Sequence, residues 1–89
     1  PKAILESMAC GVPIISTNVG MAPDIIVNGK NGFINKIEDE VGIVANALRI
    51  YNDKFLTKEF IENGIKTARK FDWKIIANEY YKKIYKTLI

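Results

Sequence analysis

The 89-residue sequence contains no histidine and only one cysteine, Cys10. Zinc and most transition-metal sites draw chiefly on these two residue types, so the composition gives no support for such a site. A single cysteine cannot form a disulfide within the chain, and the absence of internal disulfides is typical of cytosolic proteins. We expect Cys10 to be a small buried hydrophobe near the end of the first helix.

Long apolar runs are also missing. No stretch approaches the roughly 20 apolar residues that a membrane-spanning helix needs, and no signal peptide, internal repeat or low-complexity linker is visible. What is present, 48% hydrophobic and 26% charged residues, is ordinary globular usage. The length suits one small domain, which buries about 60–65% of its unfolded surface.

Charge is distributed unevenly along the chain. Up to Asp53 there are four basic and six acidic residues, a net charge of −2, and from Lys54 onward there are nine and four, a net charge of +5, which together give +3. The basic excess therefore lies in the C-terminal part. Its last basic cluster is either a solvated helix face or a contact with anionic lipid; its members are Lys82, Lys83 and Lys86. We expect no nucleic-acid partner.

The first 24 residues follow the pattern helix, stop, strand, loop. Apolar residues at helical spacing predict a helix over residues 2–10, and Gly11 is the usual residue for a left-handed cap. The apolar pair Ile14-Ile15 predicts a buried parallel strand over residues 13–17. Polar residues follow this strand at its C-terminal end, where open α/β sheets bind ligands; they are Ser16, Thr17 and Asn18, followed by Gly20.

Glu6 is the one acid on the first predicted helix. Among apolar neighbours a carboxylate must be paired, hydrogen-bonded or placed in a cleft. It can accept two hydroxyl hydrogen bonds, such as a nucleotide ribose offers. An exposed or salt-bridged surface glutamate is the alternative. The N-terminus of the same helix is a candidate anion site, with a merely solvated helix end as the alternative.

The rest of the chain predicts one more strand and several helices. We expect a short helical turn over 22–27, an edge-like strand at 33–34, and a helix from about 38 to 51. A second helix, capped by Asp53, should run to about 70. A final helix, capped by Asp72, follows, and we expect it to carry an apolar stripe from Trp73 to Leu88. The third helix carries its apolar residues on one face: Val41, Val44, Ala45, Leu48 and Tyr51. Gly64 either weakens its helix or lets another backbone approach closely. Two short strands make no stable sheet alone, so we expect further strands before Pro1.

Four segments resemble one family. The run from Glu6 to Ile15 resembles the second half of the E-x7-E signature, with its continuation, of family-4 retaining glycosyltransferases. Later segments are similar to that family's further motifs, in the same order: 20–26, 28–34 and 71–73. The resemblance implies an α/β fragment, part of the Rossmann-like parallel-sheet lobe of a two-lobed glycosyltransferase-B fold with a helical C-terminal tail. Residues 1–72 would belong to the nucleotide-sugar-binding lobe, and 73–89 would cross to the absent N-terminal lobe.

The resemblance also implies a function, the transfer of a sugar from a nucleotide-diphosphate sugar to an acceptor with retention of configuration. Glu6 matches the glutamate that binds the donor ribose, and the backbone amides of Lys2, Ala3 and Ile4 match those that bind its diphosphate. The sugar-contacting acid and a basic pair lie outside the chain. We therefore expect no catalytic residue, metal or cofactor within it, and no activity from it alone.

Two other interpretations stay open. One is a non-catalytic Rossmann-like module that binds a nucleotide or a protein, and the other is a nucleotide-sugar epimerase of similar fold. The expected partners are the donor, an unidentified acceptor and the missing N-terminal lobe. The expected location is the cytoplasm, with or without peripheral contact with an anionic membrane.

Overall fold

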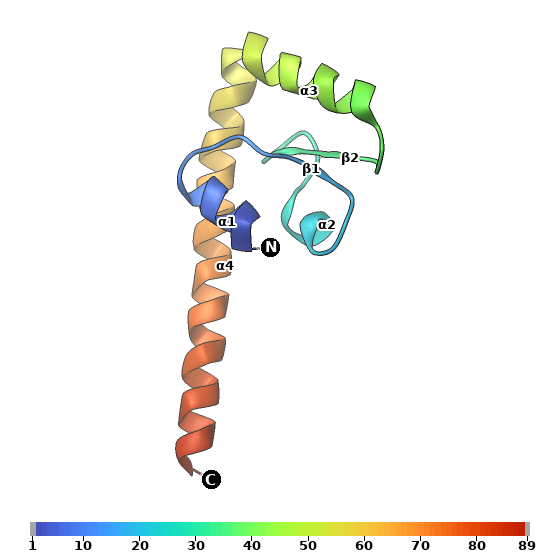
Figure 1. The fold of residues 1–89 in the computed structure, drawn as a ribbon. Helices are drawn as coiled ribbons and strands as arrows, with labels where there is room; N and C mark the ends of the chain where they lie inside the picture. The colour runs from blue at the N-terminus through green and yellow to red at the C-terminus, as the bar shows by residue number, and fades with distance from the viewer. Residues whose placement is uncertain (1, 89) are drawn as a thin grey trace.

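The computed structural model describes the backbone of residues 2–88 and the side chains of residues 3–71. The elements in order are α1 (Lys2–Ala9), β1 (Ile15–Thr17), α2 (Ala22–Ile25), β2 (Phe33–Asn35), α3 (Glu40–Asn52) and α4 (Lys54–Leu88). Figure 1 shows α1 crossing α4, the two strands beside them, α2 on one side of the strands and α3 on the other. The first five elements confirm the predicted ones, with ends that differ by at most two residues.

The predicted break near Asp72 is wrong. The backbone of α4 is helical without interruption from Lys54 to Leu88. The sequence from Ile65 to Leu88 contains neither glycine nor proline, and an aspartate inside a helix costs well under about 1 kcal/mol. Asp72 alone is therefore too weak a signal to end the helix. The apolar stripe expected from Trp73 to Leu88 falls outside the described side chains.

The strands β1 and β2 pair in parallel. The parallel character expected of β1 is confirmed, but its three residues are half-buried rather than buried. Ile15 lies opposite Phe33, and Thr17 lies opposite Asn35. The ladder extends past both ends of the strands: the Phe33 N–H donates to the Ile14 carbonyl at 2.9 Å, and the Asn18 N–H donates to the Asn35 carbonyl at 2.9 Å. The connection between the strands contains α2, so this part of the chain is an α/β unit with a parallel sheet.

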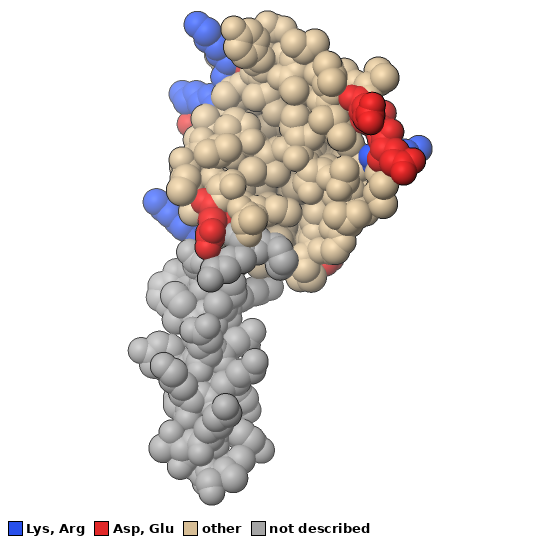
Figure 2. All heavy atoms as spheres, in the orientation of Figure 1, with Lys and Arg blue, Asp and Glu red and all other residues tan. Residues whose placement is uncertain are grey.

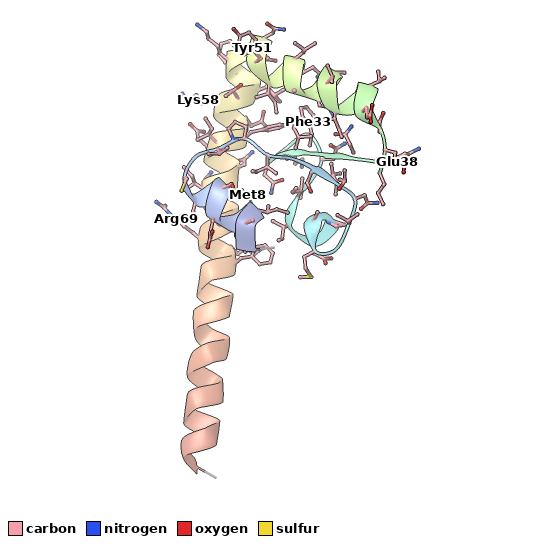
Figure 3. The ribbon with its side chains drawn as sticks, viewed as in Figure 1. Met8, Phe33, Glu38, Tyr51, Lys58 and Arg69 are labelled. Atoms are coloured by element: carbon pink, nitrogen blue, oxygen red, sulfur yellow. The ribbon has the colours of Figure 1, made fainter. Side chains whose placement is uncertain are left out.

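Helix α1 packs closely on α4. Met8, only 1% exposed, lies where the two helices cross (Figure 3). A Cβ atom added at Gly64 would lie 3.4 Å from Met8 Cγ and 3.8 Å from its Cα. Close backbone approach, one of the two expectations for Gly64, is therefore confirmed. The buried core around this crossing draws on α1, α2 and α4: Leu5, Met8, Ala22, Ile25, Ile26 and Ala68.

Aromatic and polar contacts connect the rest of the unit to α4. The Phe33 ring of β2 meets the Phe60 ring of α4 edge to face, with centroids 4.9 Å apart. The buried Asn31 accepts a hydrogen bond from the Val27 N–H at 2.8 Å and donates to the Thr67 hydroxyl at 3.0 Å. The Phe33–Phe60 and Asn31–Thr67 contacts join the segment from α2 to β2 to helix α4. The buried side-chain amide of Asn31 has hydrogen-bond partners for both its oxygen and its nitrogen.

Helix α3 is held by its inner side. The Asp39 carboxylate accepts from the Gly42 N–H at 3.0 Å and caps the helix. The Asn46 side chain donates to the Asn35 side chain at 3.0 Å. The Arg49 guanidinium lies 4.9 Å from the centroid of the Phe33 ring, a cation–π contact. The contacts of Asn46 and Arg49 with β2 fix the rotation of α3 about its own axis, whereas the Asp39 cap acts within the helix's own first turn.

The expectation that Cys10 is buried is wrong, because the thiol is free and exposed. Successive residues of a helix rotate by about 100°, so a position five beyond Leu5 lies well away from the side that Leu5 presents. Leu5 and Met8 are the buried residues of α1. Cys10 follows the end of the helix on the opposite side and faces solvent.

The glycine at position 32 allows a testable comparison. A Cβ atom there would lie 2.9 Å from the Ile14 carbonyl oxygen, a backbone atom of the paired segment. We expect Gly32→Ala to lower the free energy of unfolding by about 1–3 kcal/mol through this overpacking. Urea unfolding followed by circular dichroism measures the change.

Gly64→Ala is the matched control. Its added methyl meets only ordinary van der Waals distances to the flexible Met8 side chain, and alanine favours a helix over glycine by about 1 kcal/mol. We expect this variant to be at least as stable as the parent. Equal losses in the two variants would contradict the assigned difference in backbone proximity.

Candidate functional site

The candidate site is built on α1 and on the loop after β1. Gly11 follows the C-terminal end of α1, and its φ of 75° is in the left-handed region. The Gly11 N–H donates to the Met8 carbonyl at 3.1 Å and the Val12 N–H donates to the Ser7 carbonyl at 3.0 Å. This pair of bonds is a Schellman cap, and it turns the chain from α1 toward β1. The sequence signal for the cap, glycine directly after the apolar pattern, is confirmed.

Glu6 lies on the exposed side of α1. Leu5 and Met8 turn toward α4, and the helical rotation then directs the carboxylate of Glu6 toward solvent. Among the described residues no hydrogen bond or ion pair involves this carboxylate. A hydrated carboxylate carries no desolvation cost, so an exposed Glu6 needs no partner, and none of the side chains of residues 3–71 binds its two oxygens.

The first turn of α1 lies just before Glu6 in the sequence. Lys2, Ala3 and Ile4 form this turn, and it contains no acidic residue. The N–H groups of a first helical turn have no acceptor within the helix, and the helix dipole places partial positive charge there. Ala3 is exposed and Ile4 packs against the core. Four residues of helical rise, roughly 6 Å, separate Lys2 from Glu6 along the axis.

The loop after β1 presents polar groups and open backbone. The Ser16 hydroxyl donates to the Thr17 carbonyl at 3.1 Å, and Asn18 is exposed. Gly20 has a φ of 54°, and no atom lies within 4 Å of the position that a Cβ would take. This loop leads directly into α2, whose Ala22 and Ile25 share the core cluster with α1. The loop and α1 thus belong to one packed unit.

Asp24 lies in the first turn of α2 and is exposed. The residue before α2 is Met21, and no side chain caps this helix by a hydrogen bond. Asp24 therefore contributes through its charge beside the helix N-terminus. In the described part of the chain, no group of three or more acidic or cysteine side chains could hold a metal ion. None of the helices within that part is long and apolar enough to cross a membrane.

One hollow lies away from the sequence-predicted residues. It occupies the corner where α3 meets α4 and has a volume of about 560 Å³. Its lining includes Ile50, Tyr51, Lys54 and Ile61. Sequence reasoning did not single out this corner, because its shape depends on the angle between two helices, which no local pattern records.

Comparison with known proteins identifies one family of sequences that are similar to this chain. The family described as glycosyl transferases group 1 matches residues 1–67. The chain is 32% identical over 78 residues to the N-acetyl-alpha-D-glucosaminyl L-malate synthase of Bacillus anthracis, covering 86% of this chain and 20% of that protein. It is 38% identical over 76 residues to the capsular polysaccharide biosynthesis glycosyltransferase CapM of Staphylococcus aureus, covering 84% and 20%.

A solved structure agrees with these relatives. The sucrose-phosphate synthase of Thermosynechococcus elongatus superposes with a TM-score of 0.82 at 25% identity, over 99% of this chain and 22% of that one. The fold is therefore part of the Rossmann-like lobe of a glycosyltransferase-B fold. The chain belongs to the glycosyl transferases group 1 family, as its four motifs indicate. It spans about a fifth of the length of these two bacterial relatives.

The exposure of Glu6 leads to a prediction about stability. Because no described residue binds its carboxylate, we expect Glu6→Gln to change the free energy of unfolding by no more than about 0.5 kcal/mol. Met8→Ala, on the same helix but buried against α4, should cost about 2–5 kcal/mol. Thermal or urea unfolding measures both variants. A loss for Glu6→Gln comparable with that for Met8→Ala would mean that Glu6 has a structural role.

Proposed function

We propose that the protein transfers a sugar from a nucleotide-diphosphate sugar to an acceptor with retention of configuration, and that this chain supplies part of the donor site. One observation carries the proposal: in a chain of this family, an exposed carboxylate that no described side chain binds lies on the helix whose N-terminal amides begin four residues earlier. A nucleoside diphosphate offers the two matching groups, a pair of ribose hydroxyls and an anionic diphosphate.

Glu6 would hold the ribose. An ionised carboxylate has two oxygens and accepts a hydrogen bond from each of two neighbouring hydroxyls. Such bonds are charge-assisted, so they are about twice as strong as bonds between neutral groups. The rigid placement of α1 on α4 through Leu5 and Met8 supports this role, because a carboxylate fixed before the ligand arrives loses less entropy on binding.

The first turn of α1 would hold the diphosphate through the backbone amides of Lys2, Ala3 and Ile4. Amide N–H groups at a helix N-terminus bind anions without help from a side chain. They also stabilise the charge that collects on the diphosphate as the bond to the sugar breaks. We assign no catalytic residue to this chain and no metal or cofactor.

We further propose that residues 1–72 belong to the donor-binding lobe and that residues 73–89 cross to the N-terminal lobe. The supporting observation is the unbroken backbone of α4, whose second half runs away from the remaining elements in Figure 1. The acceptor stays unidentified. We place the reaction in the cytoplasm, where the exposed thiol of Cys10 is kept reduced.

The main test concerns Glu6 in the full-length protein. Glu6→Ala removes a charge-assisted hydrogen-bond acceptor worth about 1.5–3 kcal/mol. We expect the dissociation constant for the preferred nucleoside diphosphate, chosen by titrating UDP, GDP, ADP and TDP, to rise about 10- to 150-fold. Isothermal titration calorimetry gives the constants.

Glu59→Ala provides the control, because Glu59 is an exposed glutamate on α4, outside the proposed donor site. It should leave nucleotide affinity unchanged. If folded Glu6→Ala protein binds the nucleoside diphosphate as tightly as the parent does, the ribose assignment is wrong.

The 89-residue chain alone should transfer no sugar. It lacks the acceptor lobe and the sugar-contacting acid that the resemblance places outside it. The measurement is release of nucleoside diphosphate from UDP-, GDP- and ADP-sugars in the presence of acceptor candidates, with mass-verified chain. Turnover above the rate of a buffer blank would show that these residues suffice for catalysis.

A further inference from the structure

The hollow in the corner between the end of α3 and the start of α4, hereafter the elbow hollow, lies outside the candidate donor site. Its volume of about 560 Å³ falls within the range of about 300–1,000 Å³ that small-molecule sites occupy. Seven side chains line it: Ile50, Tyr51, Lys54, Thr57, Lys58, Ile61 and Glu62. Figure 3 labels Tyr51 and Lys58 at this corner.

The floor of the elbow hollow is mainly apolar and held from two sides. Ile50, Thr57 and Ile61 are half-buried, whereas the other four lining residues are exposed, so a floor lies below a rim. The Thr57 hydroxyl donates to the Ile50 carbonyl and ties the first turn of α4 to the last turn of α3. Ile61 Cγ2 lies 3.5 Å from the position that a Cβ atom would take at Gly11. The floor therefore also borders the C-terminal end of α1.

The rim of the elbow hollow carries an excess of positive charge. Lys54 and Lys58 lie one helical turn apart on α4, so they are neighbours on its surface. Lys58 is paired with Glu62 at 4.0 Å in an exposed ion pair, and such pairs are weak. Among the side chains of residues 3–71 no ion pair involves Lys54. Figure 2 shows basic side chains along the edge of the molecule that α4 forms.

The lining favours a ligand with two chemically different ends. The half-buried isoleucines offer apolar contact, and the Thr57 hydroxyl is already used within the protein, so the floor suits a hydrocarbon body. The Tyr51 ring, whose residue is 84% exposed, can cover such a body from the rim. The ammonium group of Lys54 suits an acidic head. Sites for small molecules commonly combine apolar walls with a few charged groups in this way.

We propose that the elbow hollow binds a small soluble amphipathic acid, with its hydrocarbon body on Ile50 and Ile61 and its carboxylate or phosphate head at Lys54 and Lys58. The concave shape favours a small molecule over a bilayer, because a flat lipid surface would meet the exposed rim and leave the half-buried floor uncovered. The proposal does not depend on the sugar-transfer function. The hollow borders the C-terminal end of α1, whereas the proposed diphosphate site is at its first turn.

The test uses the whole polypeptide in which these residues are expressed. Octyl phosphate is the probe, and octanol, which has the same hydrocarbon body without the charge, is its control. Titrations followed by ligand-observed NMR give both dissociation constants. We expect octyl phosphate to bind about 3- to 20-fold more tightly than octanol, because two exposed charge contacts add to the same apolar contact.

Substitutions at the rim test the position of the acidic head. Lys54→Gln should weaken the binding of octyl phosphate about 2- to 5-fold and leave that of octanol unchanged. Glu62→Gln should tighten the binding of octyl phosphate, because it frees the ammonium of Lys58. Lys66→Gln is the matched control, since Lys66 is an exposed lysine of α4 outside the hollow, and it should change neither constant. Circular dichroism should show an unchanged fold, because all three substituted residues are exposed.

A second pair of variants tests the place of the hydrocarbon body. Tyr51→Ala removes a ring from the rim, so it should weaken the binding of octyl phosphate and octanol by similar factors. Phe55→Ala is its control, because Phe55 is an aromatic residue that is 87% exposed and does not line the hollow. It should leave both dissociation constants unchanged.

Four outcomes would overturn the proposal. Equal affinity of the parent for octyl phosphate and octanol would mean that the rim recognises no acid. A loss for Lys66→Gln as large as that for Lys54→Gln would mean that octyl phosphate binds α4 by general charge attraction. Absence of binding by either ligand would mean that another segment of the same polypeptide covers the hollow. Flotation with phosphatidic acid vesicles that is lost in Lys54→Gln would mean that this corner contacts a membrane.

Discussion

The crossing of α1 over α4 is the contact on which the rest of this structure depends. An isolated helix of eight residues is unstable in water, because nucleation costs more than so few hydrogen bonds return. Helix α1 persists because Leu5 and Met8 are buried against α4, where Gly64 lets the backbones approach. The same contact determines the direction of everything else on α1. With Leu5 and Met8 turned inward, the carboxylate of Glu6 must face solvent.

Helices α1 and α3 are held in place by different kinds of contact. Helix α1 is anchored by apolar burial and a Schellman cap, whereas α3 is anchored largely by polar and cation–π contacts through Asp39, Asn46 and Arg49. These polar contacts supplement an inner face whose apolar residues, Ile43 and Ile50, are only half-buried. This explains how α3 can be firmly placed while its large apolar side chains point outward. The two helices therefore present different surfaces: a carboxylate and free amides on α1, and an apolar stripe on α3.

Much of the architecture could be predicted from local patterns. The element order up to α3, the cap at Gly11 and the cap at Asp53, whose carboxylate accepts from the Phe55 and Leu56 N–H groups, follow from residues close in sequence. The pairing of β1 with β2 joins residues eighteen positions apart, and no local pattern predicts it. Two expectations failed for a shared reason. Asp72 suggested a helix start and Cys10 a buried residue, and both inferences took the common behaviour of a residue type as decisive. The helix-forming residues on both sides of Asp72 continue the helix through it. The rotation of the helix places Cys10 on the side that faces solvent.

The sequence by itself determined the local structure and the family. Periodicity, caps and turn residues act over a few positions, and the motifs from Glu6 to Ile34 keep their order and spacing along the chain, so both can be recognised without coordinates. Only the tertiary structure decided which apolar residues are covered. Val41 and Leu48 satisfy the same helical spacing as Leu5 and Met8, yet the first pair is exposed and the second is buried. Burial depends on which element lies against a helix face, and the contacting residue can be more than fifty positions away, as Gly64 of α4 is from Met8.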